Sequence, residues 1–202
     1  MEALSGPTIE WGAASRTLAG ESESGDRHLV TILPDGALLA VADGLGHGPE
    51  AARAAELAIR IVERHAALPL TEIVQRCQGS LVKTRGAALS LARWITGTRK
   101  LSWLGVGNVE GLLLKNGSGG GPARERLLQR VGVVGTRLPP LQESAIALPE
   151  GGVLIFTTDG IAGDIEPLAG RRIRPQPMAE EILARCAKAT DDALVLVARL
   201  GA

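Results

Sequence analysis

The sequence predicts an α+β fold in which antiparallel β-sheets are covered by helices. Segments with strand character follow one another in runs, and the helical patterns are grouped, whereas a parallel sheet needs strict alternation of strands and helices. The chain has 202 residues, of which 45% are hydrophobic, and this is enough to bury one substantial core. We therefore expect a single domain over residues 1–202.

The N-terminal elements follow from turn and periodicity signals. Residues 1–20 are expected to hold an edge strand and a loop. Pro34-Asp35-Gly36 is a strong turn signal, so strands 28–33 and 37–43 should form a hairpin. A helix should begin at Gly48-Pro49, because proline is acceptable at the first helical position. Its apolar stripe consists of Ala51, Ala54, Ala55, Ala58, Ile61, Val62 and His65.

The remaining elements are predicted in the same way. A second helix is expected at about 70–83 and a late helix near 177–189. Residues 116–122 are rich in glycine and are expected to form a loop. The predicted strands are 87–95, 100–106, 109–115, 124–130, 143–147, 152–158 and 193–200.

Two apolar strands end in the same dipeptide. Strand 37–43 runs into Asp43-Gly44, and strand 152–158 runs into Asp159-Gly160. A carboxylate at the end of a buried strand, next to a glycine that lets the backbone turn close to a ligand, is placed for metal binding. Acidic residues also precede two strands, at Asp26 and at Asp191-Asp192.

The hairpin should bring the first two carboxylates together. If Leu33 pairs with Ala37, Asp43 lies opposite Arg27, with Asp26 one step away. Cross-strand neighbours are about 5 Å apart, which is close enough for both carboxylates to bind one ion. The same logic applies at the other end of the chain.

Antiparallel strands 152–158 and 193–200 would bring Asp159 beside Asp191-Asp192. Like charges at such distances repel unless a cation separates them. Ligands that are all oxygen indicate a hard cation, Mg²⁺ or Mn²⁺. The two cysteines and three histidines have no zinc-chelating spacing.

Four segments carry a family resemblance. Residues 41–48, Val-Ala-Asp-Gly-Leu-Gly-His-Gly, resemble the second signature of the metal-dependent protein phosphatases (PPM), and most closely their bacterial SpoIIE-like branch. Residues 24–26 resemble the first motif of that branch, 156–161 its late strand motif and 190–195 its C-terminal acidic motif. Residues 105–111, Gly-Val-Gly-Asn-Val-Glu-Gly, are similar to a short stand-alone member that acts on the bacterial stressosome.

The resemblance implies a four-layer α/β/β/α sandwich and a site with two Mn²⁺ or Mg²⁺ ions. Asp43 would be the catalytic residue and bridge both ions, with Asp26 and the Gly44 carbonyl completing one site. Asp159 and Asp191 would complete the other, and Asp192 is the alternative to Asp191. A hydroxide bridging the ions would attack phosphorus directly. No phosphate-binding arginine is assigned, because Arg16 lies in no matching motif.

The resemblance also implies a substrate: phosphoserine or phosphothreonine on STAS-domain signalling proteins of the stressosome. One alternative is a phosphorylated anti-anti-sigma factor outside any stressosome, and another is a phosphoprotein-binding module without activity. The 22 basic and 22 acidic residues balance, so no nucleic-acid partner is expected. Without a long apolar stretch or signal peptide we expect no membrane partner, a cytoplasmic location and a monomer.

Overall fold

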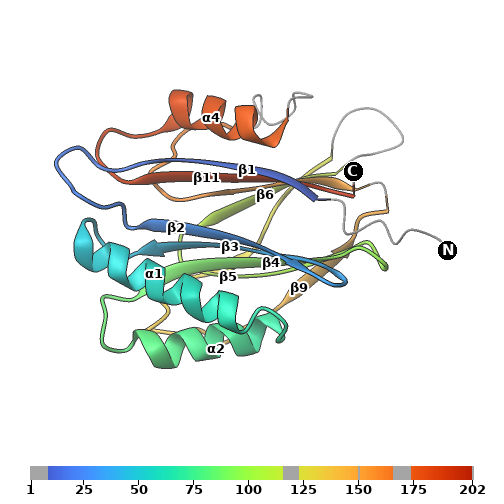
Figure 1. Cartoon of the computed structure of the whole chain (residues 1–202), viewed down its shortest axis with the longest axis horizontal. Coiled ribbons are helices and arrows are strands. Elements are labelled where there is room, and N and C mark those ends of the chain that lie inside the picture. The colour runs from blue at the N-terminus through green and yellow to red at the C-terminus, as the bar shows by residue number, and fades with distance from the viewer. Residues whose placement is uncertain (1–8, 116–122, 150, 166–173, 202) are drawn as a thin grey trace.

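The computed structural model describes residues 9–115, 123–149, 151–165 and 174–201, in two stacked β-sheets with helices on both outer faces (Figure 1). The predicted loop at 116–122 lies outside these residues. Within the described ranges, no helix combines the length and apolar character needed to cross a membrane. The predicted α+β class and the four-layer α/β/β/α arrangement are confirmed.

The upper sheet in Figure 1 has the strand order β1-β11-β10-β6-β7, and all its neighbours are antiparallel. Its first and last strands in the chain, β1 and β11, pair along their whole length. Helix α4 (Pro175–Cys186) covers its outer face. The strands of this sheet are β1 (Ile9–Arg16), β6 (Glu110–Lys115), β7 (Ala123–Arg126), β10 (Gly152–Thr157) and β11 (Ala193–Leu200).

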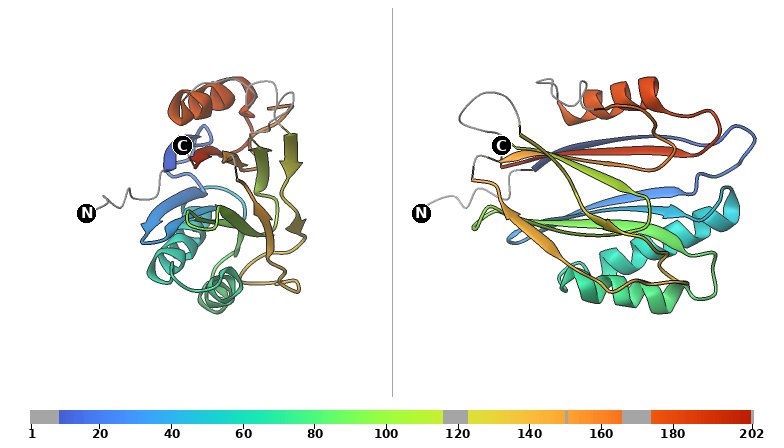
Figure 2. Two further views of the ribbon diagram at one scale, coloured as in Figure 1. Left: turned by 90° about the vertical axis from the view of Figure 1, so that its right-hand side faces the viewer. Right: turned by 180° about the vertical axis from the view of Figure 1, so that it is seen from behind.

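The lower sheet has the order β2-β3-β4-β5-β8, and β9 also pairs with β5. Helices α1 (Pro49–Arg64) and α2 (Leu70–Leu81) cover its outer face (Figure 2). The strands of this sheet are β2 (Asp26–Leu33), β3 (Gly36–Gly44), β4 (Ala87–Ile95), β5 (Lys100–Val106), β8 (Gln129–Arg130) and β9 (Ser144–Ala147).

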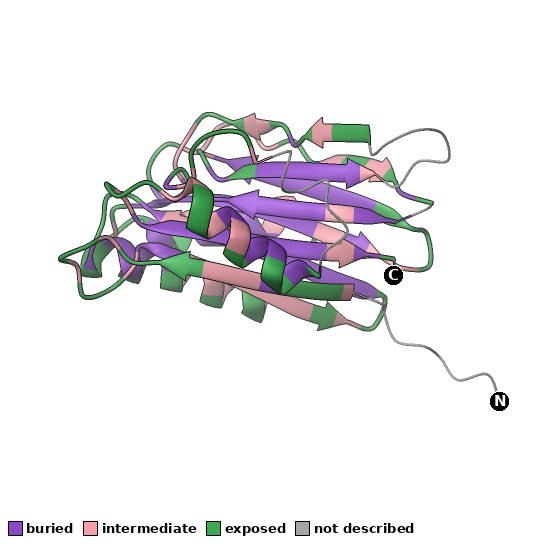
Figure 3. Cartoon of the chain, turned by 90° about the horizontal axis from the view of Figure 1, so that it is seen from above, coloured by how far each residue is buried: buried purple, intermediate pink, exposed green. Residues whose placement is uncertain are grey.

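Three apolar layers hold the sandwich together. One lies between α1, α2 and the lower sheet, one between the two sheets, and one between α4 and the upper sheet. Figure 3 shows the consequence, because the central strands are buried while the edge strands are partly exposed. The strands therefore lie on a rigid core, and their ends are fixed relative to one another.

The structure corrects the predicted register of the first hairpin. Leu33 pairs with Gly36 and not with Ala37, so the loop contains only Pro34 and Asp35. Gly36 belongs to β3 because it has no side chain: a Cβ there would lie 1.8 Å from the carbonyl oxygen of Trp94 on the neighbouring strand. The shift by one residue places Asp26, and not Arg27, directly opposite Asp43.

A second correction concerns the predicted strand 124–130. The chain turns at Leu127, whose backbone N–H donates to the carbonyl of Gly111 at 2.8 Å and whose side chain is buried between the sheets. Residues 123–126 therefore pair in the upper sheet, and residues 129–130 pair in parallel with β5 in the lower sheet. His65, predicted on the apolar stripe of the first helix, is half-buried and caps the C-terminus of α1.

Candidate metal centre

The candidate site lies at the left end of the sandwich in Figure 1, where β2 begins and β3 ends. Asp26 and Asp43 face each other as a direct cross-strand pair at this end. Asp26 is only 4% exposed, and Asp43 is half-buried. Two carboxylates in this position repel each other unless they share a proton or a cation.

Thr158 fixes the orientation of Asp26. This residue follows β10 in the upper sheet, and its hydroxyl donates to Oδ2 of Asp26 at 2.7 Å. The same hydroxyl oxygen accepts the backbone N–H of Leu194 at 2.9 Å. The hydroxyl hydrogen therefore has one available direction, toward the carboxylate, and the bond joins the two sheets at the site.

Asp159 follows Thr158 and is held from two sides. The side-chain amide of Asn108 donates to Oδ2 of Asp159 at 2.6 Å. The ammonium group of Lys188 donates to the main-chain carbonyl of Asp159 at 2.5 Å. Asn108 comes from the turn after β5, so the lower sheet contributes to the position of an upper-sheet carboxylate.

The two neighbouring acids Asp191 and Asp192 have different surroundings. Asp192 is 3% exposed, and its carboxylate accepts the backbone N–H groups of Gly25 at 2.7 Å and Leu18 at 2.8 Å. Both of its oxygens are thus used to hold the connection between β1 and β2. Asp191 is half-buried, which raises its pKa, and the charge of Asp159 adds to the rise. Asp191 is therefore better placed than Asp192 to offer oxygen to a cation.

Gly44 lies between the β2–β3 pair and the start of α1. Its backbone N–H donates to the carbonyl of Gly25 at 3.0 Å. A Cβ on Gly44 would lie 2.0 Å from the carbonyl oxygen of Ala51, so no side chain fits between the strand and the helix. The glycine keeps α1 close to the carboxylates, and its own carbonyl stays at the strand end.

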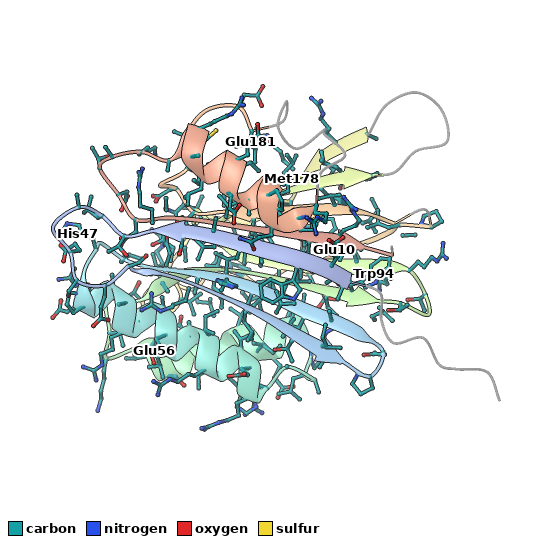
Figure 4. All side chains as sticks on the ribbon, turned by 45° about the horizontal axis from the view of Figure 1, so that its top comes forward. Glu10, His47, Glu56, Trp94, Met178 and Glu181 are labelled. Carbon is teal, nitrogen blue, oxygen red and sulfur yellow. The ribbon has the colours of Figure 1, made fainter. Side chains whose placement is uncertain are left out.

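The loop after Gly44 carries His47, which Figure 4 shows at the outer end of the sandwich. Nδ1 of His47 lies 2.5 Å from a carboxylate oxygen of Glu21. Glu21 belongs to the connection between β1 and β2, so this contact ties the loop to that connection. His47 belongs to the segment 41–48 that carries the family resemblance, and its partner Glu21 could not be identified from the sequence.

The electrostatics of the site are dominated by buried carboxylates. Burial raises the pKa of Asp43 to about 8, and the adjacent charge of Asp26 adds to the rise. Burial also raises the pKa of Asp26 to about 7, against the opposing effect of the hydrogen bond from Thr158. The carboxylates of Asp159, Asp191 and Asp192 raise both values further. The five carboxylates therefore act on one another as a single cluster.

The donor set fits a hard divalent cation. In the described part of the chain, no three His, Cys, Asp or Glu side chains already stand close enough together to hold one ion. The coupled carboxylates nevertheless come from both sheets and meet at one end, and every one is an oxygen donor. Such a set, completed by water, matches the ligands that Mg²⁺ and Mn²⁺ prefer. A cation there would also offset the repulsion between the carboxylates, which adds to the effect of burial on the pKa values of Asp26 and Asp43.

The predicted site residues lie at the same end of the sandwich, and their role as metal ligands stays a prediction: Asp26, Asp43, Gly44, Asp159, Asp191 and Asp192. Sequence reasoning missed the roles of Thr158, Asn108 and Lys188 beside them. Thr158 and Asn108 lie inside the segments 156–161 and 105–111, which carry the family resemblance, and this membership was the signal that could have identified them. Lys188 had no such signal, because only the fold brings it to Asp159.

Comparisons with known proteins agree with this geometry. The family model described as Stage II sporulation protein E (SpoIIE) matches residues 34–201. Phosphoserine phosphatase RsbX of Bacillus subtilis (strain 168) is 31% identical over 94 residues, which cover 46% of this chain and 47% of RsbX. The match therefore spans about half the length of that curated relative.

Solved structures match over nearly the whole chain. One, from work on the bacterial stressosome as a modular system adapted to control secondary messenger signalling, is 33% identical with a TM-score of 0.87; the match covers 95% of this chain and 100% of that one. RsbX in complex with magnesium is 21% identical with a TM-score of 0.86, covering 99% of this chain and 98% of the other. At 21% identity, the similarity to RsbX shows only that the two chains share a fold.

Proposed function

Because the chain belongs to the SpoIIE family, in the SpoIIE-like branch of the metal-dependent protein phosphatases, we propose that it hydrolyses phosphoserine or phosphothreonine on a signalling protein. The observation that carries the proposal is the cluster of coupled carboxylates from both sheets, held in place by Thr158 and Asn108. The similarity to phosphoserine phosphatase RsbX supports the reaction class.

The proposed ligands divide between two ions, Mn²⁺ or Mg²⁺. Asp43 would bridge them, Asp26 and the Gly44 carbonyl would complete one site, and Asp159 and Asp191 the other. When bound, the ions supply a water molecule of lowered pKa and neutralise charge on the phosphate oxygens. Solved relatives of the same fold contain magnesium or manganese, which supports this assignment.

The surrounding residues would keep these ligands in position. The Thr158 hydroxyl donates to one oxygen of Asp26 and leaves the other available to an ion. Asn108 does the same for Asp159. Asp192 fixes the loop that carries Asp26, because it holds the backbone of Gly25 next to it. These bonds restrict the movement of Asp26 and Asp159, which lowers the conformational cost of binding an ion.

The proposed partners are phosphorylated STAS-domain proteins of a stressosome. The match to a chain from work on the bacterial stressosome supports this choice, since it covers 95% of this chain. An anti-anti-sigma factor outside a stressosome remains the alternative substrate for the same chemistry. The second alternative, a module that binds phosphoproteins without hydrolysing them, is distinguished from the enzyme by measuring turnover.

A single set of measurements tests the proposal. The purified protein is assayed on para-nitrophenyl phosphate with Mn²⁺, with Mg²⁺ and with excess chelator. Candidate STAS phosphoproteins are then treated in the same way and examined by mass spectrometry. We expect turnover only with a divalent ion, and loss of phosphate from serine or threonine. Binding of phosphoproteins without turnover under any metal condition would favour the non-catalytic module.

A further inference from the structure

A surface groove of about 620 Å³ lies between residues 129–131 and residues 139–142. Its first wall is β8 and the residue after it. Its second wall belongs to the connection that leads to β9. Figure 2 shows this part of the chain crossing from the upper to the lower sheet on the side away from the viewer in Figure 1.

Two large apolar side chains at or near the groove are exposed to water. Val131, in its wall, is 96% exposed, and the nearby Leu128 is 60% exposed. No other large hydrophobic side chain within the described ranges is as exposed as Val131. An apolar side chain fully in water gains free energy when a partner covers it.

Backbone hydrogen bonds fix the walls of the groove. The N–H of Val133 donates to the carbonyl of Arg137 at 3.0 Å, which closes the turn between the walls. Val134 exchanges both backbone bonds with Ala87, at 2.9 and 3.0 Å. The side chain of Arg130 donates across the groove to the amide oxygen of Gln142. The groove is therefore formed before a ligand arrives, and binding orders little of this protein.

A short chain of contacts connects the groove to the carboxylates. The carbonyl of Arg130 accepts the N–H of Gly107 at 2.9 Å. The next residue, Asn108, donates to the carboxylate of Asp159. The groove is thus linked through two hydrogen bonds of neighbouring residues to a carboxylate that we propose as a metal ligand.

The charge of the groove selects the partner. The ionisable side chains of residues 127–142 are Arg130 and Arg137, and both are positive. Both are exposed, and among the described residues neither is paired with a carboxylate. Arg130 lines the groove beside the exposed Val131, and Arg137 belongs to the turn that joins its walls. This combination favours a segment with an apolar side chain and acidic ones.

We infer that this groove binds the segment of the phosphoprotein substrate that flanks the phosphorylated residue, and that it selects an extended peptide with an apolar residue next to acidic residues. The inference rests on the proposed function for the identity of the partner. The groove itself supplies affinity and selectivity, while the carboxylate cluster supplies the chemistry. Removal of the groove contacts therefore raises KM for a docked substrate and leaves kcat unchanged.

Two synthetic phosphoserine peptides of equal length test this inference. One has a leucine and two glutamates beside the phosphoserine, and the other has an alanine and two lysines. The variants are Val131→Ser and Arg137→Glu, which alter exposed side chains. Val82→Ser, at a valine that is 61% exposed after α2, and Arg64→Glu, at the end of α1, are the matched controls. Para-nitrophenyl phosphate serves as the substrate that does not dock.

For the wild-type protein we expect a lower KM for the acidic peptide. Val131→Ser should raise that KM by about fivefold to tenfold, as expected for losing one buried valine contact. Arg137→Glu should reduce the preference between the peptides, as should high salt in the wild type. Both variants should hydrolyse para-nitrophenyl phosphate within about twofold of wild type, as should the controls on all substrates.

Binding in chelator separates the two proposals. The anisotropy of each peptide, labelled with fluorescein, reports affinity without turnover. Selective binding that Val131→Ser weakens supports the groove even if no substrate is hydrolysed, and the proposed function then fails alone. Equal binding of both peptides, or variants that bind as wild type does, overturns the groove proposal. So does a dimer in analytical ultracentrifugation that Val131→Ser dissociates without changing KM, because the occupant is then a second copy of this chain.

Discussion

Replacing Asp43 with asparagine should stabilise the metal-free protein and abolish hydrolysis. The unfolded chain ionises this carboxyl near its ordinary pKa of 3.8, whereas the folded protein holds it at about 8. The folded state therefore binds the proton more tightly, and its stability falls as the pH rises from about 4 to about 8. Asparagine has nearly the same shape and carries no charge, so folding of the variant requires no proton uptake at this position.

The size of the effect follows from the shift. At pH 7 the cost is at most about 4 kcal/mol, from roughly 1.4 kcal/mol for each pH unit above 3.8. Asp43 is half-buried, and screening by solvent reduces this to about 1–3 kcal/mol. For a chain of this length the melting temperature should rise by about 3–10 °C. At pH 5 the gain should be roughly a third as large.

The assay is thermal unfolding by circular dichroism in excess chelator, at pH 5 and pH 7. Asp35→Asn is the matched control, because Asp35 lies exposed in the turn of the same hairpin. Its melting temperature should stay within about 1 °C of wild type. An Asp43→Asn protein that melts at or below the wild-type temperature at pH 7 would refute the reasoning. Near wild-type turnover with Mn²⁺ would refute the bridging role.

Further predictions concern the same cluster. Asp191→Asn should reduce activity by at least about a hundredfold with little change in stability. Asp192→Asn should lower stability by about 1–3 kcal/mol, because it weakens the hydrogen bonds from the buried backbone N–H of Gly25 and the half-buried N–H of Leu18. Urea unfolding and turnover together distinguish the two variants. Thr158→Val should lower metal affinity and turnover, while Thr158→Ser, which keeps the hydroxyl, should restore both; titration with Mn²⁺ measures this. Because the pKa values of Asp26 and Asp43 are raised, the wild-type melting temperature in chelator should fall between pH 5 and pH 8 and recover when Mn²⁺ is added; a flat profile would contradict the raised values.

The sequence was sufficient for the ends of the strands but not for their register. The repeated Asp-Gly dipeptide placed the carboxylates at one end of the fold, because strand ends are a local property. The register of the first hairpin depends on Gly36, which belongs to β3 only because the carbonyl of Trp94 occupies the space of a side chain. That contact is tertiary, and no turn signal contains it.

The division of the predicted strand 124–130 has the same origin. Its residues continue to favour a strand, and only the bond from Leu127 to Gly111 turns the chain toward the other sheet. Asn108 and Lys188 were likewise beyond prediction, because each reaches Asp159 from a distant part of the sequence. The acids themselves were predictable, while the groups that hold them depend on how the sheets stack.

The pairing of β1 with β11 and the bond from Thr158 to Asp26 have a consequence for synthesis of the protein. The pairing of β1 with β11 requires that β11 has been synthesised, and the hydroxyl of Thr158 reaches Asp26 across 132 positions of sequence. A nascent chain that has emerged from the ribosome as far as α4 holds Asp26 and Asp43 on a finished hairpin but lacks Asp191. Contacts of such long range form slowly, so the site should be among the last regions to become ordered. A chain synthesised only as far as α4 would therefore lack the complete carboxylate cluster.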